Sequence, residues 1–70
     1  GRVMIATKQA QQARIHELRI EIDKLDAFVN SANNPDYGHL LRPHKAILNR
    51  RLYALRQLMQ VLNEELHFLT

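Results

Sequence analysis

Residues 47–69 read ILNRRLYALRQLMQVLNEELHFL, and the leucine pattern of this stretch decides the fold. Its apolar side chains recur at alternating spacings of four and three residues, the period of one face of an α-helix. Because the pattern continues for three heptads, it favours coiled-coil-like packing against another helix. Pro43 suits the first turn of this helix, which is predicted to span about 43–69. This first stripe consists of Leu48, Leu52, Leu55, Met59, Leu62, Leu66 and Leu69.

A partner helix is predicted in the first half of the chain, at about residues 6–30. Its apolar stripe, again at spacings of three and four, is Ile15, Leu18, Ile22, Leu25 and Val29. The segment at about 31–42 combines Asn, Pro, Asp and Gly as loops do. Its apolar Leu40 and Leu41 are expected to fold back over the helix ends. The sequence therefore predicts an all-α, antiparallel two-helix hairpin, with residues 1–70 as a single domain.

A second apolar stripe lies beside the first on the C-terminal helix. Together the two stripes are wider than one antiparallel partner helix can cover. A chain of 70 residues forms only a marginal core, and without cysteine it has no disulfide to add stability. We therefore expect the hairpin to assemble into a homo-oligomeric helical bundle. The expected interface consists of Phe28, Ile47, Ala54, Leu58, Val61 and Phe68.

Positive charge is concentrated in the second half of the chain. The net charge is only +3, yet no acidic residue occurs between Tyr37 and Asn63. Several of the cations lie near the predicted start of the second helix, where free N–H groups and the helix dipole also favour an anion. Tyr37 and His39 add groups that can stack on, or hydrogen-bond to, a base. The candidate ligand-binding residues are Tyr37, His39, Arg42, His44, Lys45, Arg50 and Arg51.

Two interpretations of this basic cluster remain open. Arg51 is in register with the second apolar stripe, so in the first interpretation it points toward a groove between subunits. In the second, the cations only keep a leucine-rich helix in solution and Tyr37 covers the core.

The residues give little support to catalysis or metal binding. The four histidines include no pair at i,i+3 or i,i+4 on one helix, and no HExxH motif is present. The hydroxyl residues stand in no nucleophile elbow and have no base at a recognisable spacing. A subunit of two helices also leaves little room for a buried pocket. We expect a protein that is not an enzyme, binds no metal and needs no cofactor.

Nucleic-acid binding is a weaker prediction, and no membrane partner is expected. A pI near 9.8 usually suggests nucleic-acid binding, but no helix-turn-helix of ordinary dimensions fits two long helices joined by a loop of roughly a dozen residues. Residues 1–5, with one Arg and three apolar residues, fall far short of the apolar core of a signal peptide or of a membrane span. The absence of cysteine is consistent with the cytoplasm.

Parts of the chain resemble a family of small phage-encoded helical hairpins, mostly of unknown function. The similar segments are KLDAFVNS at residues 24–31, Tyr37 and Leu40, and ILNRRLYALRQLMQVL at residues 47–62. That family shares a Lys-Leu-x-x-Phe-aliphatic-x-Ser end to the first helix and the pattern LLxxQLxxMxxYxxIL in the second.

The resemblance implies a phage or prophage origin, an accessory role and a compact helical assembly in the cytoplasm of a bacterial host. The chain departs from the family at Arg51, Leu55 and Leu58, which replace Gln, Met and Tyr, so no binding residue is carried over. Several unrelated small helical phage proteins sequester the cyclic nucleotides of bacterial immune signalling. By that analogy we expect an anti-defence sponge that binds a small anionic ligand, a cyclic nucleotide.

Two alternatives remain from other classes of function. The first is a protein-interaction module, an adaptor or inhibitor that docks the second stripe on a bacterial host protein. Nucleic-acid binding is the second, and the less favoured.

Overall fold

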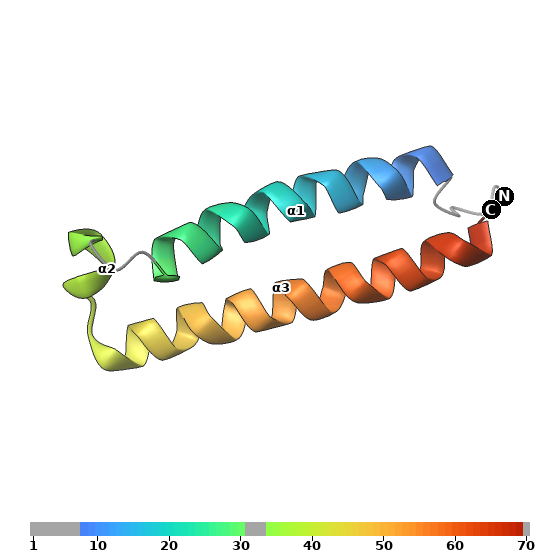
Figure 1. Cartoon of the computed structure of the whole chain (residues 1–70). Helices are drawn as coiled ribbons and strands as arrows, with labels where there is room; N and C mark the ends of the chain where they lie inside the picture. Colours follow the sequence, from blue (N-terminus) through green and yellow to red (C-terminus); the bar gives the residue numbers. More distant parts are fainter. Residues whose placement is uncertain (1–7, 31–33, 70) are drawn as a thin grey trace, which may run out of the picture.

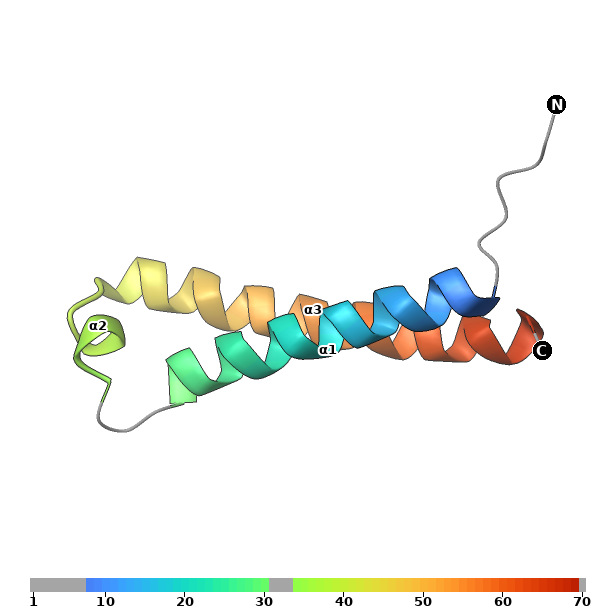
Figure 2. The same ribbon diagram turned by 90° about the horizontal axis from the view of Figure 1, so that it is seen from above.

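The chain folds into a helical hairpin (Figure 1). A computed structural model describes residues 8–30 and 34–69. The helices α1 (Lys8–Asn30) and α3 (Arg42–Leu69) pack against each other, and α2 (Pro35–Gly38) is a single turn between them. Figures 1 and 2 show α2 at one end of the pair, while the start of α1 and the end of α3 lie together at the other end. The predicted all-α antiparallel hairpin is thus confirmed.

The helix bounds agree closely with the prediction, except in the loop. Residues 6 and 7 of the predicted first helix lie outside the described residues, and α3 begins one residue before the predicted start. The short helix α2 was not predicted. Asn34 caps it with an extended backbone (φ −87°, ψ 102°), as the residue before a proline favours, and its side chain accepts the N–H of Asp36 at 3.0 Å.

The core is one seam between α1 and α3. Its buried side chains are Ile15, Leu18, Ile22, Val29, Leu52 and Leu62, against which Leu25, Leu48, Leu55, Met59 and Leu66 pack half-buried. This confirms that the first stripe of α3 packs on the stripe of α1. Two helices enclose no interior, so no large side chain in the described segments is completely buried.

One polar side chain, Gln11, lies inside the seam with 3% of its surface exposed. Its Nε2 donates to the carbonyl oxygen of Leu62 at 3.2 Å and to Oε1 of Glu65 at 2.6 Å. Gln11 stands four residues before Ile15 and therefore continues the stripe of α1. It joins the start of α1 to the end of α3.

The two leucines that precede α3 differ in burial. Leu40 is half-buried, but 77% of Leu41 is exposed, so the expectation that both fold back over the helix ends is wrong for Leu41. The carbonyl of Leu41 accepts the N–H of Lys45 at 3.0 Å, which ties this residue to the first turn of α3 instead of the seam.

Within residues 8–30 and 34–69, none of the helices combines the length and the hydropathy that crossing a bilayer requires.

Candidate binding surfaces

Tyr37 is held between the two long helices at the α2 end. Its ring meets Phe28 of α1 edge-on, with centroids 5.7 Å apart and planes at 86°. From α3, Lys45 Nζ lies 5.2 Å from the ring centroid, and Asn49 Nδ2 donates to the hydroxyl at 3.0 Å. Tyr37 thus fastens α2 to both long helices. These contacts favour the interpretation that Tyr37 covers the core over the interpretation that it stacks on a base.

Four basic candidates share the α2 end of the hairpin, and we call them the loop-end cluster: His39, Arg42, His44 and Lys45. Three of them are exposed, and Lys45 is half-buried against Tyr37. Arg42, and Arg50 two turns further along α3, form no ion pair with any residue that the structure describes. The cluster therefore leaves positive charge facing solvent, with Asp36 of α2 as the acid nearest in sequence.

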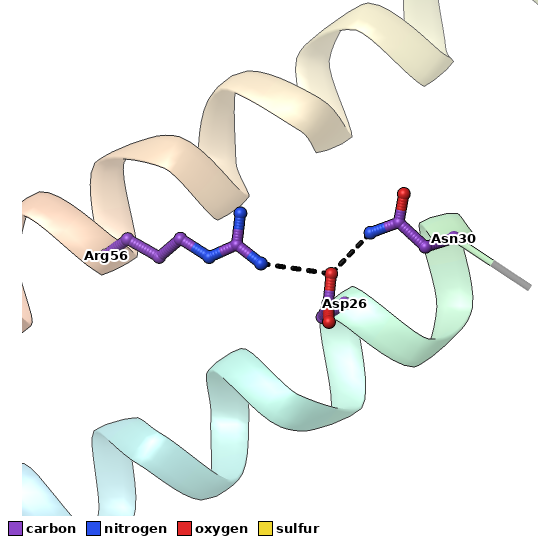
Figure 3. A network of polar contacts seen from close by, with 3 residues as sticks. All are labelled: Asp26, Asn30 and Arg56. Carbon is purple, nitrogen blue, oxygen red and sulfur yellow. Dashed lines mark hydrogen bonds and ion pairs between the residues drawn. The ribbon is translucent and has the colours of Figure 1, made fainter.

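Two other cations of the acid-free stretch are paired with carboxylates of α1. Arg51 Nη2 lies 3.1 Å from Oε1 of Glu21, and Arg56 Nη2 lies 3.1 Å from Oδ1 of Asp26. Figure 3 shows the second pair, in which Asn30 Nδ2 also donates to Asp26. Both pairs are half-exposed, so each stabilises the fold by at most about 1 kcal/mol. They do neutralise charge, because α1 supplies the acids that this part of the sequence lacks.

Most of the expected interface residues form a band on the outside of α3. We call this band the α3 stripe: Ile47, Ala54, Leu58, Val61 and Phe68. Ile47 is 52% exposed, Val61 56% and Phe68 90%. The sixth expected residue, Phe28, is half-buried against Tyr37 and the core instead.

An open groove of about 210 Å³ runs between α1 and α3 beside the α3 stripe. Its apolar lining is Leu18, Leu55 and Leu58, and its charged lining is Arg14, Glu17 and Glu21. Leu58 belongs to the groove and to the α3 stripe, so the two form one continuous face. A second open groove is lined by Lys8, Gln12, Asn63, Leu66 and His67.

Metal-binding groups do not converge in the part of the chain that the structure describes. No three His, Asp or Glu side chains of residues 8–30 and 34–69 come together in a way that could hold an ion.

The contacts of Gln11, Glu21 and Asp26 were not predicted from the sequence. Gln11 carries a detectable signal, since its spacing of four from Ile15 places it on the core face. Glu21 and Asp26 carry none, because their pairing with Arg51 and Arg56 depends on the register of the two helices.

Comparisons with protein-family models, with curated proteins and with solved structures find no match to this chain. The resemblance to phage-encoded hairpins stays a prediction that rests on residues 24–31, Tyr37, Leu40 and residues 47–62.

Proposed function

We propose that the chain is a non-catalytic module that assembles with copies of itself and binds a small anionic ligand. The observation that carries this proposal is the α3 stripe, which stays exposed along a helix whose neighbouring face already fills the seam. Contiguous apolar surface of this kind marks interaction sites. Small scaffolds without disulfides commonly gain their missing stability from partner chains.

The loop-end cluster supports the proposal that the ligand is an anion. Exposed Arg42 and His44 share the first turn of α3, and Arg donates to phosphate oxygens in a bidentate manner. The ligand class we propose is a cyclic di- or trinucleotide, whose phosphates match this charge. In a phage, the setting that the resemblance suggests, such binding sequesters the cyclic nucleotides of bacterial immune signalling. Arg51 and Arg56 are already paired with carboxylates of α1, so we assign phosphate binding to the loop-end cluster.

Calorimetry against a panel of cyclic di- and trinucleotides tests the ligand. We expect measurable heat with the wild-type protein and a large loss of affinity for Arg42→Glu, which reverses a charge of the loop-end cluster. Arg56→Gln is the matched control, because Arg56 is paired with Asp26 outside the cluster. A folded, oligomeric protein that gives no heat with any member of the panel contradicts the ligand proposal.

Light scattering on Leu58→Asp tests the assembly. The substitution places an unpaired charge in the proposed interface, so the variant should dissociate or unfold. Gln57→Asp, one residue away on an exposed polar position, should keep the wild-type mass and melting temperature. If Leu58→Asp also keeps both, the α3 stripe is not an interface.

One observation favours a second function, docking on a bacterial host protein. Phe68 is 90% exposed at the open end of the hairpin, and helix-in-groove recognition uses such apolar anchors at helical spacing. A wild-type protein that stays monomeric at high concentration leaves the α3 stripe available for this kind of partner. A stable oligomer that buries the stripe rules the second function out.

A further inference from the structure

The face around the α3 stripe is complementary to itself about Leu58, because residues at similar distances on either side of Leu58 are either both apolar or oppositely charged. Moving outward from Leu58 in both directions, Ala54 matches Val61, Arg51 matches Glu65, and Ile47 matches Phe68. We propose that a second copy of the chain covers this face, with its α3 antiparallel to the first and a two-fold axis near Leu58. This inference rests on the proposed self-assembly, to which it adds the face, the register and the ion pairs between subunits.

In this arrangement the matched residues meet across the two-fold axis. Apolar Ile47 faces Phe68 of the other copy, and the small Ala54 faces Val61. Arg51 faces Glu65, and the symmetry forms this ion pair twice, because an isologous interface uses every contact in both directions. Arg51 can serve both partners, since 59% of its side chain stays exposed while it contacts Glu21 at 3.1 Å.

The charges of this face suit a second copy better than an acidic or basic partner. On α1, Arg14, Glu17, Glu21 and Lys24 follow one another at spacings of three, four and three, and so share one side of the helix. With Arg51 and Glu65 of α3, these side chains are three cations and three anions, and Arg50, which lies three residues after Ile47 and four before Ala54, adds a fourth cation at the edge of the stripe. A face that carries both signs in nearly equal number can complement itself, whereas a strongly acidic or strongly basic partner would leave the charges of one sign unpaired.

The face is also large enough for a stable dimer. The 28 residues of α3 extend about 42 Å, and two helices side by side are about 20 Å wide. The outline of this face, about 800 Å², is comparable with the roughly 800 Å² that each partner buries in an interface of standard size.

Charge reversal across the two-fold axis tests the register. Arg51→Glu and Glu65→Arg each set like charges against each other twice across the axis, so each variant alone should self-associate on the order of tenfold more weakly or worse. Each also loses a contact within its own chain, that of Arg51 with Glu21 or that of Glu65 with Gln11, so masses are compared only between variants that remain folded. An equimolar mixture of the two variants should recover the wild-type mass, because across the two-fold axis each Arg then meets a Glu. The double variant Arg51→Glu/Glu65→Arg should recover it in a single chain. Sedimentation measures the mass, and circular dichroism verifies that each variant is folded.

Arg56→Glu is the control, because it breaks the other interhelical ion pair, of the same 3.1 Å length, on the side of α3 away from the stripe. It should keep the wild-type mass. If wild type is an oligomer but neither the mixture nor the double variant recovers its mass, the register is overturned and self-assembly stands. A wild-type chain that is monomeric at every concentration overturns both proposals.

Discussion

Gln11 shows how one polar residue can decide the pairing of two helices. Leucine stripes tolerate a shift of one helix along the other, since apolar contacts are not directional. The amide of Gln11 is directional, and it reaches a carbonyl of α3 at 3.2 Å and the Glu65 carboxylate at 2.6 Å. A single buried polar group can fix the register of a coiled coil in this way. Gln11 therefore fixes which turn of α1 faces which turn of α3.

Gln11→Ala should lower the free energy of unfolding by about 1 to 3 kcal/mol, since it removes two hydrogen bonds, one of them to a charged acceptor. Urea denaturation measures this change. Gln12→Ala is the matched control, because Gln12 is exposed on the same turn and its loss should change the stability by no more than about 0.5 kcal/mol. Equal midpoints for the two variants contradict the role of Gln11.

The elements were predictable to different degrees, for physical reasons. Both long helices follow from their apolar periodicity, which is local and continues over many turns. The short α2 does not, because four residues cannot form a stable helix alone and this one is held by contacts of Tyr37 with Phe28, Lys45 and Asn49. The loop-end cluster was predictable because its residues are neighbours in sequence. The pairing of Arg51 with Glu21 was not, since it joins residues thirty positions apart.

Tyr37→Ala should therefore loosen α2 and lower the melting temperature. It removes a half-buried aromatic ring with three partners, for which a loss of about 2 to 4 kcal/mol is expected. Tyr53→Ala removes the same side chain from an exposed position of α3 and should change the stability by no more than about 0.5 kcal/mol. Thermal denaturation compares the two variants. A similar effect of both substitutions shows that Tyr37 does not anchor α2.

At the scale of the whole molecule, the hairpin separates two kinds of surface. Its basic charge is exposed at the α2 end, and its apolar α3 stripe runs along a face of balanced charge. Self-association through that face leaves the loop-end clusters accessible. Assembly and ligand binding are then separable, so a variant that loses one activity can keep the other.

Folding of the chain should be coupled to its assembly. Residues 8–30 and 34–69 of one chain bury a single seam between two helices, so much of the stability should come from the interface and unfolding should accompany dissociation. The wild-type melting temperature should then rise by several degrees when the protein concentration is raised about 100-fold, as mass action requires. A folded Leu58→Asp variant should melt at a lower temperature that does not depend on concentration, because it unfolds as a monomer. Differential scanning calorimetry over that range measures both. The wild-type melting temperature could instead be independent of concentration and no lower than that of the variant. That result would mean that the seam alone stabilises the hairpin and that the α3 stripe adds no stability through a second copy.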